Sequence, residues 1–443
     1  MRYQTVDQWL EWQQTLHPKA IDMSLDRIAT VAHRLQLDTP TLKARGCTLI
    51  SIAGTNGKGS CVRSLEQFLL GQGLSAGAFT SPHVLRYNER IRINGSDVAD
   101  DDLLKAFAAI DQARAEISLT YFEFSTLAAA WLFAEYQVRY WLLEVGLGGR
   151  LDSVNIWDAD IAIITSIGID HIQWLGDTRE KIGAEKAGIF RPGQLAICAD
   201  RKPPASIADA ARNRQTRLRQ VGIDFNWREE GGLLHWWQEN SASERQMRTM
   251  PRPNLPLASV AAALTALSEL QQLPSNEQCQ ELAHKLALAG RFQAASYRNL
   301  PLILDVAHNE DSARLLADLL TERTKTAANG LKLAAVFAVM ADKSLPEIIE
   351  PLLPLVNQWF LPQLPGNDRA ADNKDVERAL QRAGGDTLCC EEMAAALTAA
   401  EAAQPDLVVV FGSFYTVEAC LLAPEVTVSR ETGDTEPQFG LSK

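Results

Sequence analysis

The first half of this chain alternates between short apolar runs rich in β-branched residues and longer stretches with helical periodicity. The apolar runs cover residues 47–53, 75–80, 140–145, 161–167 and 195–198. Candidate helices with an apolar stripe cover residues 62–70, 102–114 and 126–136. Strands that alternate with helices typically form a parallel sheet with helices on both faces. We therefore predict a doubly wound α/β fold for this half.

The pattern changes near residue 222 and returns after residue 290. Short polar pieces with three tryptophans and a proline cluster occupy residues 222–253, which indicates an antiparallel excursion. A second alternating series has candidate strands at residues 302–306, 333–338, 358–361 and 407–411. We predict a parallel-sheet domain over residues 1–293, a smaller Rossmann-like α/β domain over 294–423, and a flexible tail over 424–443.

Charge and composition exclude several classes of function. The 443 residues carry 43 Lys and Arg against 55 Asp and Glu, which disfavours sequence-independent contacts with nucleic acid. No apolar run reaches the roughly 20 residues that cross a bilayer, and the N-terminus lacks the pattern of a secretory signal. The seven cysteines form no CxxC pair, so we expect reduced thiols. We expect a cytoplasmic monomer that binds neither nucleic acid nor membranes.

A glycine-rich loop lies between the first apolar run and the first candidate helix. It consists of Gly54, Thr55, Asn56, Gly57, Lys58, Gly59 and Ser60. Backbone N–H groups at a helix N-terminus bind phosphates, and one lysine adds a mobile positive charge. The spacing departs from the common GxxxxGK[ST] pattern, and a flexible strand-to-helix turn is the alternative. We predict a nucleoside triphosphate site, which makes the first domain a P-loop-type ATPase.

Two further strand ends carry candidate ligands for a metal ion. Glu144 ends the strand predicted from Tyr140 to Leu143, on the side where an open parallel sheet binds ligands. His171 follows the run 161–167. A solvated glutamate and a packed histidine are the alternatives, but both positions neighbour the phosphate loop, where Mg²⁺ is expected. The stretch Gly146–Arg150 continues with Leu151 instead of glycine, so we reject a dinucleotide site.

Lys186 stands in the last turn of another predicted helix. Asp177–Glu180 has capping-box spacing and opens this helix, which Gly188 and Pro192 end. A surface lysine favoured by the helix dipole is the alternative to a functional role.

Several blocks in order resemble the ATP-dependent amide-forming ligases of the Mur superfamily, and specifically the folylpolyglutamate synthases with dihydrofolate synthase activity. The similarity runs over about residues 20–420. The blocks are Gly54–Ser60, Phe79–His83, Leu143–Asp152, Gly168–His171, Glu185–Ile189, Asp305–Asn309 and Gly412–Phe414.

The resemblance implies roles for individual residues. It implies that Lys58 and the loop residues, with Asn254, Arg291, Asp305 and His308, bind ATP, and that one or two Mg²⁺ ions bind to Ser60, Ser81, Glu144 and His171. It implies catalytic roles for Lys58, His171 and Lys186, with Lys186 carbamylated, and a contact of Ser413 with glutamate.

A pterin pocket is also implied by the resemblance. Its members are Leu25, Asp26, Arg27, Ile28, Thr120, Tyr121, Phe122, Glu123, Leu151, Asp152 and Ser153. Aromatic rings can stack on a flat pterin while charged groups meet its polar edges. Core packing is the alternative, because Phe122 and Phe124 are two residues apart, as on one face of a strand.

The expected reaction joins L-glutamate to dihydropteroate, or to a reduced folate, through an acyl phosphate made from ATP. The alternatives are a cell-wall precursor ligase of the same superfamily, a nucleotide-hydrolysing switch or motor, and a catalytically silent folate-binding protein.

Overall fold

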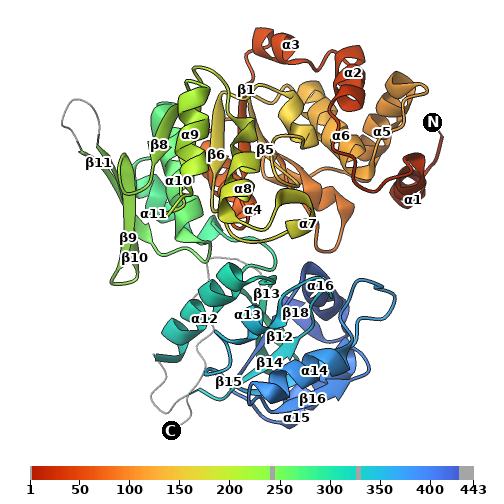
Figure 1. The fold of residues 1–443 in the computed structure, drawn as a ribbon, viewed down its shortest axis with the longest axis vertical. Helices are drawn as coiled ribbons and strands as arrows, with labels where there is room; N and C mark the ends of the chain where they lie inside the picture. Colours follow the sequence, from red (N-terminus) through yellow and green to blue (C-terminus); the bar gives the residue numbers. More distant parts are fainter. Residues whose placement is uncertain (1, 240–244, 326–330, 429–443) are drawn as a thin grey trace. The chain divides into compact units, whose positions relative to one another are not determined.

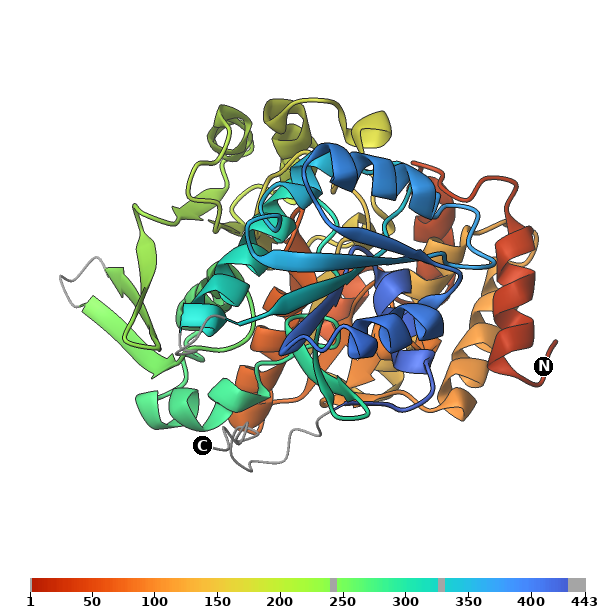
Figure 2. The same cartoon turned by 90° about the horizontal axis from the view of Figure 1, so that it is seen from below.

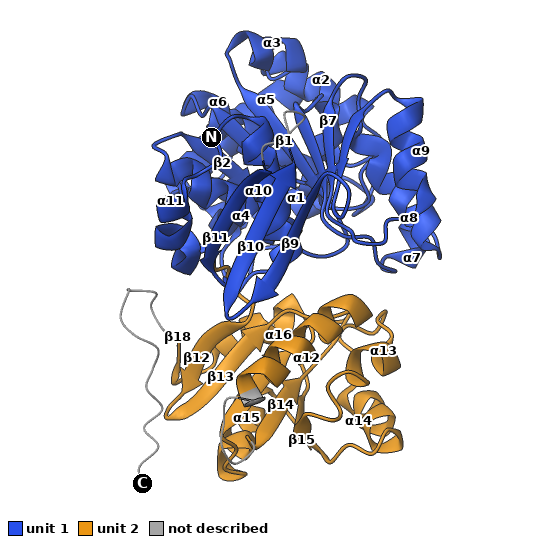
Figure 3. Cartoon of the chain, turned by 90° about the vertical axis from the view of Figure 1, so that its left-hand side faces the viewer, with its two compact units in different colours: residues 1–286 blue, residues 287–443 orange. Residues whose placement is uncertain are grey.

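A computed structural model describes residues 2–239, 245–325 and 331–428. The chain divides into two compact units, Met1–Leu286 and Ala287–Lys443 (Figure 3). We predicted the boundary at 293/294, a few residues later. The residues in between belong with the second unit because Phe292 N donates to Asp305 Oδ2 at 2.8 Å and Val306 N donates to Gly290 O at 2.9 Å.

An eight-stranded sheet forms the centre of unit 1, with strand order β4-β3-β2-β5-β1-β6-β7-β8 (Figure 1). Its strands are β1 (Thr48–Ala53), β2 (Ala76–Phe79), β3 (Ile91–Ile93), β4 (Ser96–Asp97), β5 (Tyr140–Glu144), β6 (Ile161–Ile164), β7 (Leu195–Cys198) and β8 (Arg217–Gln220). Strands β2, β5, β1, β6, β7 and β8 run parallel to one another. Beyond β2, strands β3 and β4 extend the sheet in antiparallel fashion. The predicted α/β class is confirmed.

Helices precede, connect and follow these strands. They are α1 (Val6–Leu16), α2 (Asp26–Arg34), α3 (Thr39–Ala44), α4 (Lys58–Gly71), α5 (Asp100–Arg114), α6 (Tyr121–Glu135), α7 (Ile172–Leu175), α8 (Arg179–Lys186), α9 (Ala205–Asn213), α10 (Leu257–Glu269) and α11 (Asn276–Leu282). Helix α4 follows the phosphate loop and packs against α10, β2 and β5. Every residue of β5 is buried, as expected for a central strand covered on both faces. No helix among the described residues has the length and apolar character that a membrane span requires.

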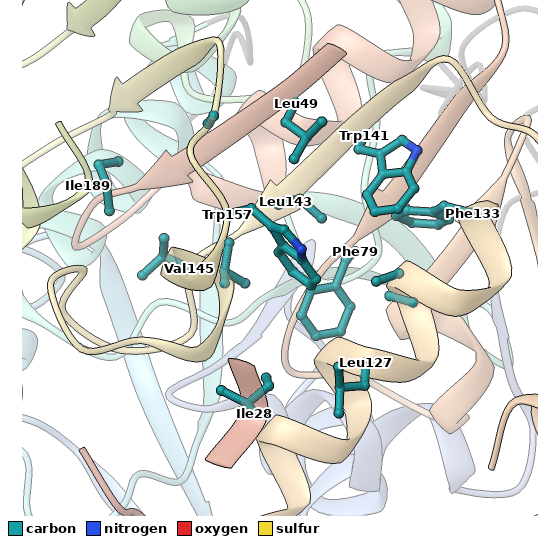
Figure 4. Packing of buried hydrophobic residues seen from close by; sticks show 14 of the residues in the cluster. Ile28, Leu49, Phe79, Leu127, Phe133, Trp141, Leu143, Val145, Trp157 and Ile189 are labelled. Carbon is teal, nitrogen blue, oxygen red and sulfur yellow. The ribbon is translucent and has the colours of Figure 1, made fainter. Parts of the chain in front are cut away.

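Aliphatic and aromatic side chains together fill the core of unit 1 (Figure 4). The ring of Trp141 on β5 lies 5.5 Å from Phe133 and 6.3 Å from Trp157, both edge-on. Gly77 on β2 makes room for this packing, because a Cβ there would lie 2.6 Å from the Phe133 ring. The large apolar area removed from water here supports the strand ends that carry the site.

The antiparallel excursion predicted for residues 222–253 is a three-stranded sheet. Its strands are β9 (Phe225–Glu230), β10 (Leu233–Glu239) and β11 (Arg245–Pro251). Trp236 on β10 is fully buried, and its indole N–H donates to Thr265 Oγ1 of α10 at 3.1 Å. The sheet is therefore attached to the helix that packs beside the phosphate-loop helix.

Unit 2 has a seven-stranded sheet with strand order β16-β15-β14-β17-β13-β12-β18. The strands are β12 (Gln293–Tyr297), β13 (Leu300–Asp305), β14 (Leu333–Phe337), β15 (Val356–Pro362), β16 (Thr387–Cys390), β17 (Leu407–Phe411) and β18 (Val426–Val428). The helices are α12 (Glu310–Lys325), α13 (Leu345–Ile349), α14 (Asn373–Arg382), α15 (Met393–Ala402) and α16 (Phe414–Leu422). Figure 2 shows helices on both faces of this sheet.

The start of the predicted tail is structured. Val426–Val428 form β18, which pairs with β12 in antiparallel fashion, so a flexible tail from residue 424 is wrong for these residues. A strand of three residues with alternating valines is too short for a periodicity signal. The rest of the predicted tail, 429–443, lies outside the described residues.

Candidate active site

The phosphate loop turns sharply between β1 and α4. Lys58 Nζ donates to Gly54 O at 3.1 Å and to Thr55 O at 3.3 Å, so its side chain folds over the loop. Gly57 has φ +83°, and a Cβ there would lie 2.4 Å from Ser259 Oγ. Only glycine fits this turn without strain, because the conformation and the space both exclude a side chain. The loop amides thus lie at the N-terminus of α4, as phosphate binding requires.

Two oxygen ligands predicted for a metal ion lie at the start of α4 and the end of β5. Ser60 is 1% exposed, and its hydroxyl has no hydrogen-bond partner among the described residues. Glu144 is also buried, and its Oε2 accepts a hydrogen bond from Ser81 N at 3.1 Å. A buried hydroxyl without a partner is costly unless a ligand completes it.

These residues fit a Mg²⁺ ion that also contacts phosphate. Magnesium prefers oxygen ligands and usually takes only one or two from carboxylates. In the part of the chain that the structure describes, no group of three or more His, Cys, Asp or Glu could hold a metal ion alone. The predicted set contains only two such residues, Glu144 and His171, with two serines, so it requires ligand oxygens.

His171 lies beyond β6, immediately before α7. Its φ is +50°, its side chain is exposed, and its N–H donates to Asp170 Oδ1 at 2.8 Å. A left-handed backbone is uncommon for residues other than glycine, although histidine adopts it more often than most. His171 lies on the loop between β6 and α7, whereas Glu144 is the last residue of β5.

Lys186 is 3% exposed at the end of α8. Burial and the charge of Lys58 lower the pKa of Lys186 to about 7, while Asp170 and Asp152 act in the opposite direction. The alternative of a surface lysine is therefore wrong. The helix begins with Thr178 as N-cap, and not with Asp177 as we predicted, because the Thr178 hydroxyl accepts from Lys181 N at 3.3 Å.

The loop after β5 packs closely against the end of α8. A Cβ on Gly149 would lie 2.8 Å from the backbone oxygens of Glu185 and Lys186. The loop can therefore approach the end of α8 this closely only because residue 149 is glycine. Asp152 in the same loop accepts from Leu147 N at 2.9 Å and from Val154 N at 3.0 Å. Burial raises the pKa of Asp152 to about 6. The loop brings this carboxyl group within electrostatic reach of Lys186.

The residues predicted to hold a pterin are joined by an ion pair between α2 and α6. Arg27 Nη2 lies 3.1 Å from Glu123 Oε1, and Arg27 Nη1 lies 3.2 Å from Asp22 Oδ1. Glu123 is buried and also accepts from Thr120 N at 2.7 Å, which closes the capping box of α6. Asp22 was not predicted, because no local sequence pattern marks it as part of a site.

The aromatic residues of this region are helical. Phe122 and Phe124 both lie on α6, so the strand interpretation is wrong; the Thr120 cap starts the helix there. The Phe122 ring lies 5.7 Å from the Phe79 ring. A Cβ on Gly146 would lie 2.5 Å from the Phe122 ring. Tyr121 lies beside Arg90, whose guanidinium is 5.5 Å from the Tyr121 ring centroid. Of the other predicted members, Ile28 and Ser153 are buried, Asp26 is exposed, and Leu25 and Leu151 are half-buried.

Four of the predicted residues lie in unit 2, and Asn254 lies in unit 1. Asp305 ends β13 and accepts from Phe292 N and Ala307 N, both at 2.8 Å. Burial raises the pKa of Asp305, although the charge of Arg291 opposes this. His308 Nδ1 lies 2.7 Å from Val306 O, and Ser413 is the N-cap of α16. Within unit 2, Asp305, His308 and Ser413 lie at or just after the ends of the neighbouring strands β13 and β17, whereas Arg291 precedes β12.

Comparison with known proteins decides the family. A Mur ligase middle-domain model matches residues 52–249, and a Mur ligase glutamate ligase domain model matches residues 290–414. The chain is 37% identical to the dihydrofolate synthase/folylpolyglutamate synthase of Escherichia coli K12 over 426 residues, which cover 96% of each chain. The chain belongs to the dihydrofolate synthase/folylpolyglutamate synthase family of Mur ligases.

Solved structures of the family agree with this fold. E. coli FolC in complex with DHPP and ADP has a TM-score of 0.85 at 35% identity, and the match covers 94% of this chain and 97% of that chain. The Yersinia pestis enzyme complexed with AMPPNP and Mn ion has a TM-score of 0.83 at 37% identity, with the same coverage. A further structure of the family contains Mn, AMPPNP and L-glutamate. Members of the family thus bind nucleotide and a divalent ion.

Proposed function

We propose that this chain is an ATP-dependent ligase that joins L-glutamate to dihydropteroate, giving dihydrofolate, and to the γ-carboxylate of folates. The observation that carries the proposal is the burial of Lys186 within electrostatic reach of Lys58 on the phosphate loop. A simple nucleotide-hydrolysing switch does not need a second, buried lysine beside its triphosphate site. The similarity to the E. coli and Y. pestis enzymes along nearly the whole chain supports the same activity.

The reaction has two steps. A carboxylate oxygen of the acceptor attacks the γ-phosphorus of ATP, the bond to the β,γ-bridging oxygen breaks, and ADP leaves. The nitrogen of L-glutamate then attacks the acyl phosphate carbon, loses a proton, and displaces inorganic phosphate. Lys58 and the amides of the phosphate loop stabilise the negative charge of the transferring phosphoryl group.

Ser60, Ser81, Glu144 and His171 would hold one or two Mg²⁺ ions. When bound, the metal neutralises phosphate charge during transfer. The buried, unpartnered Ser60 hydroxyl and the buried Glu144 carboxylate support this assignment. The Ser81 N–H keeps the Glu144 carboxylate oriented.

Lys186 would carry the carbamate. A neutral amine is needed to attack CO₂, and the new nitrogen–carbon bond forms with loss of one proton. The low pKa of Lys186 makes the neutral amine available near neutral pH. Once carbamylated, the same side chain becomes an anion that would support a second Mg²⁺.

The acceptor would bind beside α2 and α6. Arg27 and Glu123 would meet the polar edges of the pterin, with Tyr121 and Phe122 beside its faces. In unit 2, Ser413 would contact glutamate, and Arg291, Asp305 and His308 would contribute to nucleotide binding. We propose a cytoplasmic location, with which the free thiols of the described cysteines are compatible, and a monomeric state.

The test is phosphate release with ATP and glutamate, with dihydropteroate, a reduced folate monoglutamate or a muramyl nucleotide as acceptor. We expect release only when glutamate and one of the first two acceptors are both present. If, of the three acceptors, only the muramyl nucleotide supports phosphate release, the protein is a cell-wall precursor ligase. Release without acceptor or glutamate would identify a nucleotide-hydrolysing switch. The absence of release under every condition would identify a catalytically silent folate-binding protein.

A further inference from the structure

The backbone of Ile167 lies beyond the end of β6 and is held by side chains. Ile167 is 2% exposed, yet β6 ends at Ile164, so it has no strand partner. Buried backbone N–H and C=O groups need partners. Asp200 Oδ2 accepts from Ile167 N at 2.8 Å, and Arg179 Nε donates to Ile167 O at 2.7 Å.

These two side chains also bind each other. Arg179 Nη2 donates to Asp200 Oδ2 at 2.9 Å, and the Asp200 side chain is only 11% exposed. Arg179 is the first residue of α8, the helix that ends with Lys186. Asp200 follows β7. The pair therefore ties the segment after β6 to the lysine-bearing helix.

The next residue is held by the phosphate loop. Thr55 Oγ1 accepts from Gly168 N at 2.9 Å and donates to Gly168 O at 3.1 Å. Thr55 N also donates to Ser166 O at 2.9 Å. The segment that leads to His171 is thus fixed on one side to the phosphate loop and on the other to α8.

We propose that Arg179, acting with Asp200, is a positioning residue that sets the place of His171 relative to the phosphate loop. The inference rests on the proposed function, in which His171 binds the divalent ion. The reason is geometric: Arg179 and Asp200 hold the backbone of Ile167, and Thr55 holds that of Gly168, so the chain enters the turn at His171 from a fixed start. Partners that hydrogen-bond a metal ligand directly contribute about 10–100-fold to metal affinity, and we expect the indirect action of Arg179 to lie at the low end of this range.

The test measures binding of Mn²⁺ to the full chain with AMPPNP by calorimetry, together with the melting temperature. In Arg179→Met, we expect the Kd for Mn²⁺ to rise by about 10-fold or more. Arg179→Lys keeps a donor for Ile167 O and should recover part of the affinity. The control is Arg212→Met on α9, whose arginine pairs with Asp209 in an exposed ion pair and should leave the Kd unchanged.

A double-mutant cycle with His171→Ala decides whether Arg179 acts through His171. We expect Arg179→Met to add little to the Mn²⁺ Kd once His171 is removed, because both changes disable the same ligand. The positioning role is contradicted if Arg179→Met lowers only the melting temperature, or if the two effects on the Kd simply add. If His171→Ala alone leaves the Kd unchanged, the metal ligand in the proposed function is wrong and the positioning role falls with it.

Discussion

Burial of Lys186 and the nearby charge of Lys58 lower the pKa of Lys186 from 10.5 to about 7. The loop after β5 packs against the backbone of Lys186, and Gly149 permits this approach because it has no Cβ. Removing an ammonium group from water is expensive. The protein therefore keeps a destabilising group at the end of α8, which is typical of a residue retained for chemistry.

This pKa predicts how stability depends on pH. The pKa in the folded state lies below that of the unfolded chain, so the folded protein binds fewer protons between pH 7 and 10.5. The free energy of unfolding should therefore rise with pH in this window, by up to about 1.4 kcal/mol per pH unit. Lys186→Met should remove this contribution in CO₂-free buffer, as measured by denaturant unfolding. Equal pH slopes for the two proteins would show that Lys186 is not buried as an amine.

The same lysine should form a carbamate. With ¹³C-labelled bicarbonate at pH 8, we expect a carbamate carbon signal by NMR that is absent from Lys186→Ala. Ligation should fall by about 10²–10³-fold in that variant, the scale seen when a group that stabilises transition-state charge is lost. Short carboxylic acids should restore part of it.

Lys181→Ala is the matched control for this prediction, because Lys181 lies on the same helix but pairs with Asp177 at the surface. The control should keep both the signal and the activity. A signal that persists in Lys186→Ala would assign the carbamate elsewhere.

Arg27 should control the affinity for the acceptor. Arg27→Met leaves the buried Glu123 carboxylate without its cation, so we expect the KM for dihydropteroate to rise by about 10-fold or more, the effect of roughly 1.4 kcal/mol. The KM for ATP should stay the same. The control is Arg34→Met on the same helix, because Arg34 binds the backbone oxygens of Ala113 and Arg114 instead. A rise in both KM values would indicate general disruption and not an acceptor site.

The buried side-chain amide of Gln13 should lower the free energy of unfolding of the protein. Its side chain on α1 is 1% exposed, and neither amide atom has a hydrogen-bond partner among the described residues. Gln13→Leu should raise the free energy of unfolding by about 1–3 kcal/mol, because it removes an unsatisfied buried amide. Gln14→Leu, at the exposed neighbouring position, should change it little. A destabilised Gln13→Leu would mean that bound water satisfies the amide.

Much of the fold follows from local sequence patterns. The runs 195–198 and 407–411 match β7 and β17 because buried parallel strands are apolar throughout. The start of α6 was missed because the aromatic residues at 122 and 124 mimic a strand, while the capping box of Thr120 and Glu123 sets the helix start.

Long-range contacts in the site could not be predicted from such patterns. The ion pair of Arg27 with Glu123 joins residues 96 positions apart, and periodicity contains no information on such pairs. The clamp of Arg179 and Asp200 on Ile167 depends on how β6 and β7 end beside each other. The glycine-rich turn between β1 and α4, by contrast, was predictable because its glycines and lysine are adjacent in the chain.

The most direct test of the ligase mechanism follows the oxygen atoms of the acceptor carboxylate. Dihydropteroate labelled with ¹⁸O in its carboxylate is incubated with the enzyme, ATP and L-glutamate, and the released phosphate is analysed by mass spectrometry. Attack of the carboxylate on ATP predicts one ¹⁸O atom in each phosphate released. Phosphate without ¹⁸O, formed together with dihydrofolate, would contradict the acyl phosphate and with it the account of the site.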